Sequence, residues 1–172
     1  PELHGRRAAL KTARRIAVPG CHASGFISIA RPLVELGLAP ADYPFTCHSL
    51  TGYSGGGKKM IAEYEAALRP AGFSAPRAYG LSLHHKHLPE MRAAAGLSAD
   101  PIFCPIVDDY YSGMEVTVPL HTALLRGHKP AEIAAALAEY YAGEPQIAVH
   151  TLGELPADGM LWAAALAGTD RM

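Results

Sequence analysis

Residues 19–37 read PGCHASGFISIARPLVELG, a helix-breaking pair followed by a long apolar pattern. The apolar positions recur at helical spacing and are Phe26, Ile27, Ile29, Ala30, Leu33, Val34 and Leu36. This periodicity predicts a helix over residues 23–36, which Pro32 kinks and Gly37 ends as a C-terminal cap. Because Pro19 and Gly20 stop any earlier helix, Cys21 stands at the opening of this one.

Shorter helices and strands are expected along the rest of the sequence. Helical spacing predicts further helices over 58–68, 88–95 and 130–141. Apolar runs predict strands over 43–50, 77–83, 101–107, 114–120, 146–150 and 161–166. Pro119 marks its strand as an edge or a strand end. Hairpin-like strands mixed with helices favour an α+β fold with a mixed or largely antiparallel sheet over a doubly wound parallel one.

Composition limits the classes of protein. The 172 residues are 49% hydrophobic and 18% charged, which fits one domain with a true core. A net charge of −1 argues against nucleic-acid binding, and the basic run over residues 6–15 is interpreted as a solvated helix face. No apolar run reaches the roughly 20 residues of a membrane span. Three cysteines fit a reducing cytoplasm rather than a disulfide framework.

The two ends of the sequence carry no start or stop signal. Residue 1 is proline, no secretory leader follows it, and the chain closes on Asp170-Arg171-Met172. We therefore expect the sequence to be a piece of a longer protein.

Cys21 is the first candidate for chemistry. A thiol at a helix N-terminus faces unpaired backbone N–H groups and the positive end of the helix dipole, and both favour thiolate. The same donors can hold an oxyanion on an attacked carbon. The alternative is a buried structural cysteine, which is the interpretation given to Cys47 and Cys104 in their apolar strands.

A histidine cluster at residues 84–90, HHKHLPE, is the second candidate. In an extended segment His85 and His87 project to the same face, and Glu90 can fix the tautomer of an imidazole. A solvated polar loop is one alternative, and a zinc site is another. The chain has no Cys-x-x-Cys and no four-ligand pattern, so no metal is predicted.

A glycine-rich turn at residues 52–58, GYSGGGK, is the third. It has P-loop spacing, but Lys59 stands where a P-loop needs Ser or Thr for magnesium, which excludes nucleotide hydrolysis. Consecutive glycines still let backbone N–H groups approach an anion, with Ser54, Lys58 and Lys59 adding donors and charge. A plain flexible turn is the alternative.

Together these segments resemble N-acetyl-γ-glutamyl-phosphate reductase in its shorter class, the arginine-biosynthesis enzyme. The resemblance rests, in family order, on Pro19–Cys21, Ser54–Gly57, His85–Glu90, Gly113–Pro119 and Gly168–Arg171. It implies NADPH-dependent reduction of an acyl phosphate to an aldehyde through a cysteine thioester. It also implies the C-terminal, glyceraldehyde-3-phosphate-dehydrogenase-like domain of the family, and a homo-oligomer formed through an exposed sheet face.

The resemblance also implies roles for single residues. Cys21 would be the nucleophile and His87 the acid/base, with Glu90 orienting His87. The substrate and phosphate pocket would be lined by Ser54, Gly55, Tyr79 and His85. The cofactor contacts implied within this chain are Gly20 and Gly56.

Three departures from the family stand out. Val18 replaces a common asparagine, and His22 replaces a common aromatic residue. No G-x-G-x-x-G fingerprint follows an N-terminal strand, so the dinucleotide-binding domain is missing. We therefore expect residues 1–172 to be the catalytic, substrate and dimerisation domain, residues 1–20 to be a remnant of the dinucleotide-binding domain, and NADPH binding by the chain alone to be weak or absent.

Three rival functions remain open at this point. Aspartate-semialdehyde dehydrogenase runs the same thioester chemistry on another acyl phosphate. A Cys/His thiol hydrolase needs only Cys21, His87 and a carboxylate, and needs no nicotinamide. The third alternative is a dimerisation module that has no catalytic site.

Overall fold

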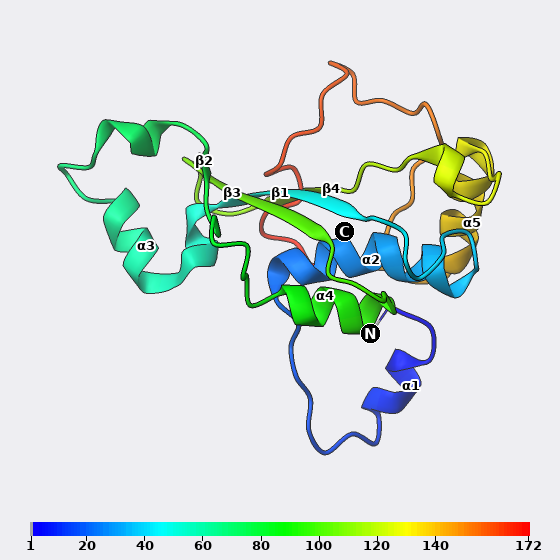
Figure 1. The fold of residues 1–172 in the computed structure, drawn as a ribbon. Coiled ribbons are helices and arrows are strands. Elements are labelled where there is room, and N and C mark those ends of the chain that lie inside the picture. The colour runs from blue at the N-terminus through cyan, green and yellow to red at the C-terminus, as the bar shows by residue number, and fades with distance from the viewer. Residues whose placement is uncertain (1) are drawn as a thin grey trace.

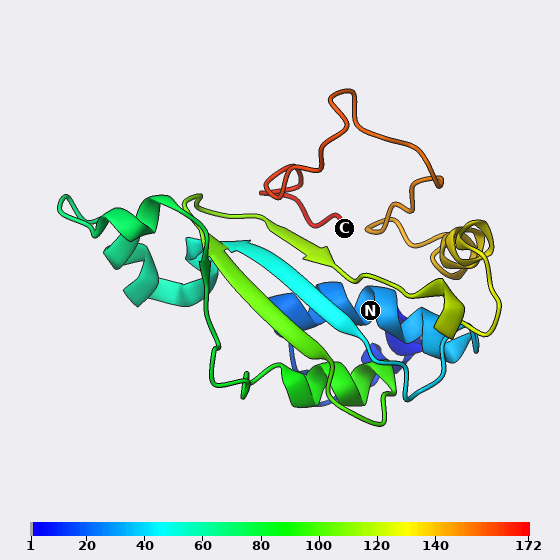
Figure 2. The same ribbon diagram turned by 45° about the horizontal axis from the view of Figure 1, so that its top comes forward.

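The computed structural model describes residues 2–172, and its centre is a four-stranded sheet (Figures 1 and 2). The strands are β1 (Thr46–Gly52), β2 (Arg77–Ala78), β3 (Ile102–Asp108) and β4 (Met114–Thr117), in the spatial order β2-β3-β1-β4. β1 and β3 run parallel, whereas β1–β4 and β2–β3 are antiparallel. The predicted α+β class with a mixed sheet is confirmed.

Helices α2 (Cys21–Glu35) and α4 (Leu88–Ala95) lie side by side on one face of this sheet (Figure 2). α5 (Pro130–Tyr140) contacts α2, and α3 (Gly57–Tyr64) lies beyond one end of the sheet (Figure 1). The remaining short elements are α1 (Arg6–Leu10), η1 (Tyr53–Gly56), η2 (Ala71–Ser74) and η3 (Thr122–Leu124).

The core forms between the sheet and these two helices. Alternation along β1 turns Cys47 inward, opposite Phe103 of β3, and both side chains are buried. From the helices, Phe26, Leu33 and Met91 are fully buried against this face. The apolar pattern of residues 26–36 is therefore the core-facing side of α2, as the spacing predicts.

Pro32 lies inside α2 and leaves one carbonyl without its helical partner. Proline has no N–H, so the carbonyl of Ser28 cannot receive its hydrogen bond from residue 32. The Tyr141 hydroxyl, which follows α5, donates to the Ser28 carbonyl at 2.6 Å. This contact satisfies the buried acceptor and ties α5 to α2.

Two predicted strands are wrong. Residues 146–150 and 161–166 form irregular and turn structure. Two backbone hydrogen bonds join residues 146–148 to Met172: Met172 N–H donates to the Gln146 carbonyl, and Ala148 N–H donates to the Met172 carbonyl. These two bonds do not extend into a strand. The run from 163 to 167 is mostly alanine and has no β-branched residue, and Gly159 and Gly168 flank the segment with φ of 73° and 76°.

Other predicted elements are present but shorter. β2 stops at Ala78 because Gly80 and Leu83 turn the chain with φ of 67° and 61°, so the strand predicted to residue 83 is wrong in length. β4 is an edge strand, as Pro119 indicates, but it ends at Thr117, so the strand predicted to residue 120 is wrong in length. β3 and β4 do not form a hairpin, because β1 lies between them.

The N-terminal basic segment stays on the surface. α1 has no buried residue, which agrees with a solvated helix face. Within residues 2–172, no helix has the length and apolar character that crossing a membrane requires.

Candidate active site

Cys21 is the first residue of α2 and its side chain is exposed. The preceding Gly20 is the N-cap in extended conformation, and its carbonyl accepts the first helical bond from Ser24 N–H at 2.9 Å. Gly20 has no side chain to bond the N–H groups of the first turn, which leaves those N–H groups at the same helix end as the thiol. The predicted position of Cys21 at a helix N-terminus is confirmed.

His85 and His87 come together beside this helix end. Their rings lie 4.7 Å apart between centroids, and His87 N–H donates to Nδ1 of His85 at 3.2 Å. The segment is a turn that leads into α4, so the prediction that His85 and His87 share one face of an extended segment is wrong. The His85 ring is therefore held by the backbone N–H of His87, and the two imidazoles meet through this turn rather than through β geometry.

The His87 ring packs directly on the residue before Cys21. A Cβ atom placed on Gly20 would lie 2.1 Å from Nε2 of His87. His87 is only 8% exposed, and its Nδ1 has no hydrogen-bond partner within residues 2–172. The His87 imidazole thus lies against the residue that precedes Cys21, although 66 positions separate Cys21 from His87 in the sequence.

Glu90 does not make the contact predicted for it. Its Oε2 accepts the backbone N–H of Gly20 at 3.1 Å, and no hydrogen bond to either imidazole is present in the described part of the chain. Its charge still acts on His87, raising the pKa of that imidazole against the larger lowering by burial. Glu90 therefore holds the N-cap of α2, and the expected orienting hydrogen bond to His87 is corrected.

Beneath these groups lies His22, which sequence reasoning treated only as a departure. It is 3% exposed, with Nδ1 2.6 Å from Ser49 Oγ and Nε2 2.6 Å from the Tyr79 hydroxyl. Its ring lies 5.7 Å from that of His87 and 6.1 Å from that of His85. Strand alternation turns Ser49 to the helix-covered face of the sheet, and this alternation is the sequence pattern from which the buried position of Ser49 could be predicted.

Burial makes all three imidazoles reluctant to take a proton. Desolvation, with His87 and His85 as charged neighbours, lowers the pKa of His22 to about 4. Burial also lowers the pKa of His85 and of His87. Burial raises the pKa of Tyr79 to about 12, with a smaller effect from the charge of Cys21. Neutral imidazoles beside a thiol are the form that a general base needs.

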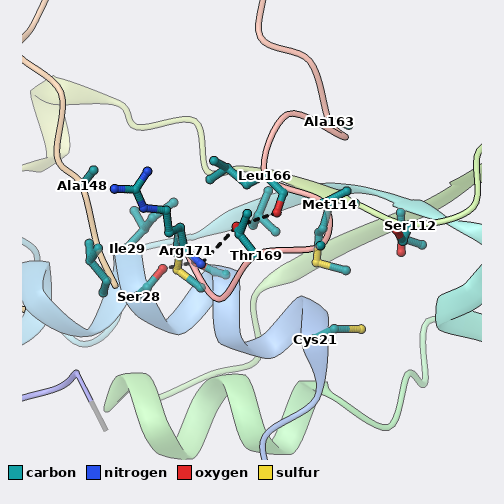
Figure 3. Close-up of a pocket in the computed structure, with 18 of the residues that line it drawn as sticks. Cys21, Ser28, Ile29, Ser112, Met114, Ala148, Ala163, Leu166, Thr169 and Arg171 are labelled. Carbon is teal, nitrogen blue, oxygen red and sulfur yellow. Dashed lines mark hydrogen bonds between the residues drawn. The ribbon is translucent and has the colours of Figure 1, made fainter. Parts of the chain in front are cut away.

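A pocket of about 680 Å³ opens on Cys21, and its lining includes Ser54 and Gly55 from η1 (Figure 3). Opposite α2, the pocket is lined by residues within the ranges 147–150 and 163–172. In Figure 3, Cys21 stands at one end, and the Arg171 guanidinium points away from it. Tyr79, His85 and His87 lie outside this lining, so Cys21 is the residue that joins the pocket to the imidazoles.

The two other cysteines differ from Cys21. Cys47 is fully buried, and desolvation raises its pKa to about 12. Cys104 is half-buried on β3. The predicted burial is confirmed for Cys47 and is wrong for Cys104, which lies on the sheet face that carries the exposed Ile102.

The glycines predicted to contact a cofactor pack against this chain's own side chains. The Cα of Gly20 is covered by His87, and a Cβ on Gly56 would lie 2.4 Å from Met60 Sδ. Gly55, Gly56 and Gly57 are nonetheless exposed to solvent. Among residues 2–172, no three His, Cys, Asp or Glu side chains gather in an arrangement that would hold a metal ion.

An exposed thiol at a helix N-terminus, with an imidazole packed on the preceding glycine, is an arrangement typical of cysteine-dependent acyl-transfer sites, and here it lies in a domain of α+β architecture. Residues 21–165 match the family model described as the semialdehyde dehydrogenase dimerisation domain. The chain belongs to this family.

Several curated relatives carry one name, N-acetyl-γ-glutamyl-phosphate reductase. The protein of Rhizobium leguminosarum bv. trifolii is 43% identical over 174 residues, which cover 99% of this chain and 56% of the relative. That of Chelativorans sp. is 48% identical over 136 residues, covering 78% and 43%. That of Brucella ovis is 41% identical over 170 residues, covering 98% and 55%. The chain spans about half the length of the curated relatives it matches.

Proposed function

We propose that this chain is the catalytic and dimerisation domain of an N-acetyl-γ-glutamyl-phosphate reductase, which makes N-acetylglutamate semialdehyde with NADPH in cytoplasmic arginine biosynthesis. The observation that carries the proposal is the His87 imidazole packed on Gly20, immediately before the exposed thiol of Cys21. The names of the relatives supply the substrate.

The chemistry proposed for Cys21 is acyl transfer. The sulfur attacks the acyl carbon of the acyl phosphate, a C–S bond forms, the C–O bond to phosphate breaks, and inorganic phosphate leaves. His87, neutral because it is buried, takes the thiol proton and later returns a proton to the oxygen or sulfur. The N–H groups at the start of α2 hold the charge that develops on the acyl oxygen.

The pocket next to Cys21 suits a small acyl phosphate. Ser54 and Gly55 offer a hydroxyl and an exposed backbone to the phosphate, and both line the same pocket as Cys21. Tyr79 and His85 lie on the imidazole side of the thiol. We assign these four residues to substrate binding.

NADPH supplies, when bound, the electron pair that reduces the thioester to the aldehyde. The exposed thiol and the exposed Gly55–Gly57 turn fit a nicotinamide that reaches Cys21 from outside this chain. Gly20 and Gly56 would meet it through backbone atoms, since side chains cover their Cα atoms. We assign the main cofactor platform to a dinucleotide-binding domain of which residues 1–20 are a remnant.

The sheet face turned away from α2 and α4 suits a second copy of the domain. Along β3 the side chains on this face are Ile102, Cys104 and Ile106, and Ile102 is 63% exposed. A sheet face carrying exposed apolar side chains is a typical interface feature. We propose that this face forms the homodimer, as the family description suggests.

The proposal is tested with the full-length protein that carries this domain. NADPH consumption that matches phosphate release from N-acetyl-γ-glutamyl phosphate, and that Cys21→Ser abolishes, supports it. Faster turnover of aspartyl phosphate would assign the aspartate-semialdehyde reaction instead. Release of the acid without NADPH would identify a thiol hydrolase.

A further inference from the structure

A buried hydrogen-bond chain runs from β1 through α2 to the site. Ser49 on β1, His22 on α2 and Tyr79 beyond β2 are linked by two contacts of 2.6 Å, one at each ring nitrogen of His22. Ser49 is fully buried and His22 nearly so. The reaction proposed above leaves both of these residues without a role.

The surroundings of Ser49 decide which atoms donate in the two hydrogen bonds of His22. Its hydroxyl has one hydrogen to donate, and within residues 2–172 His22 Nδ1 is the partner of its Oγ. A buried O–H is almost always donated, so Ser49 donates to Nδ1 and Nδ1 is the unprotonated nitrogen. His22 is neutral at pH 7, because its pKa is lowered to about 4, and a neutral imidazole carries one N–H. That N–H is therefore on Nε2, and it donates to the Tyr79 oxygen.

This direction leaves the Tyr79 hydrogen free. With its oxygen accepting from His22, the Tyr79 O–H turns away from His22, and in the described chain it meets no protein acceptor. Tyr79 is half-buried, its ring lies 6.0 Å from that of His85, and its hydroxyl contacts His22, the residue that follows Cys21 in α2. The free O–H is therefore available to a group bound beside these residues.

We propose that Ser49 fixes His22 as its Nε2–H tautomer and that His22 thereby turns the Tyr79 O–H toward Cys21, where it donates to the oxygen of the acyl group. His22 is thus a positioning residue and Tyr79 a catalytic hydrogen-bond donor. The tautomer and the direction of the Tyr79 O–H rest on the two hydrogen bonds of His22, the burial of Ser49 and the neutral form of His22, whereas the donation to the acyl oxygen rests on the proposed function.

The tautomer is tested without any substrate. ¹⁵N NMR of the selectively labelled chain distinguishes a protonated ring nitrogen from an unprotonated one, and Ser49→Ala identifies the signals of His22. A protonated Nε2 and an unprotonated Nδ1 at pH 7 are expected. A protonated Nδ1, or a histidinium, would overturn the proposal.

Titration of Tyr79 gives a second test that is independent of activity. His22→Asn places its amide near the Nδ1 position, so it keeps a group for Ser49 and removes the donor to Tyr79. Losing a donor to the phenol oxygen destabilises phenolate, so the pKa of Tyr79 must rise in this variant. If Tyr79 instead donated to His22, the same variant would lower that pKa, and the proposal would fail.

Kinetics of the full-length reductase test the catalytic half. His22→Asn is expected to lower kcat about tenfold or more with little change in KM, since a donor that acts in the transition state is misplaced. His22→Gln, whose amide reaches the Nε2 position, should recover part of the loss. In a Tyr79→Phe background, His22→Asn should cost nothing further.

An equal loss of kcat in both backgrounds would show that His22 does not act through Tyr79 and would overturn the positioning role. If the reductase activity itself is absent, the two substrate-free measurements still decide the tautomer. Failure of the proposed function is therefore distinguishable from failure of this inference.

Discussion

The Nε2 atom of His87 occupies the space in which a side chain at residue 20 would begin, only 2.1 Å from an ideal Cβ on Gly20. Glycine is required here by close packing and not by backbone conformation, because its φ of −66° and ψ of 147° suit any residue. The His87 ring can thus pack beside Cys21 only because Gly20 has no side chain.

Gly20→Ala tests this packing. The added methyl must push His87 away, and we expect a loss of about 1–3 kcal/mol in the free energy of unfolding from overpacking. Denaturant unfolding measures this loss, and Gly72→Ala is the matched control, because nothing lies within 4 Å of its Cβ position. Equal stability of the two variants would contradict the packing.

The three cysteines should differ in reactivity. Cys21 is exposed, whereas Cys47 is buried with its pKa raised to about 12, so Cys47 should alkylate on the order of a hundredfold more slowly near pH 7.5. Peptide mass mapping of a timed iodoacetamide reaction measures each site, and denatured protein gives the control rates. Cys104 reacting as fast as Cys21 in the native chain would count against an activated thiol.

Glu90 should act as a cap through hydrogen bonding. Its Oε2 accepts the Gly20 N–H, so Glu90→Ala should cost about 1 kcal/mol of unfolding free energy, as other lost N-cap acceptors do. Glu90→Gln keeps an acceptor and should restore most of that stability. If Gln is as harmful as Ala, the charge on the carboxylate, and not the hydrogen bond, is what matters.

Acid should destabilise the fold through His22. In the unfolded chain its pKa is the ordinary 6.5, and in the folded chain burial lowers the pKa to about 4. Between these values the unfolded state binds more protons, so stability falls as pH falls, by about 3 kcal/mol from this residue between pH 7 and pH 4.

Chemical denaturation at each pH measures this slope. His22→Asn removes the titrating group and should flatten the profile, while His85 and His87, whose pKa values are lowered in the same direction, retain their share. An unchanged profile in His22→Asn would show that His22 is not buried in its neutral form.

Local sequence patterns predicted the helices that begin at Cys21 and Leu88, because caps and apolar spacing act within one turn. They did not predict that β1 separates β3 from β4, since strand order depends on contacts distant in sequence. They failed for residues 146–150 and 161–166, where short apolar runs lack pairing partners. Strand prediction needs neighbours that no local window contains.

The same limit applies to the site. Cys21, His85 and His87 were identified from residue chemistry and resemblance, and the fold brings them together. The partner of Glu90 was predicted wrongly, because the closeness of Glu90 to His87 in the sequence says nothing about the Gly20 backbone N–H, which is distant in the sequence. His22 was missed as a member of the site, since its two partners, Ser49 within β1 and Tyr79 just after β2, are distant from it in the sequence.

Thioester formation is the step on which the proposed chemistry depends. Full-length protein mixed with N-acetyl-γ-glutamyl phosphate in the absence of NADPH, quenched in acid and digested, should show the N-acetylglutamyl group on the Cys21 peptide by mass spectrometry. One phosphate should be released for each acylated chain, and Cys21→Ser should show neither. Phosphate release that persists in Cys21→Ser, or an intact acyl phosphate beside unmodified Cys21, would contradict nucleophilic catalysis by this thiol.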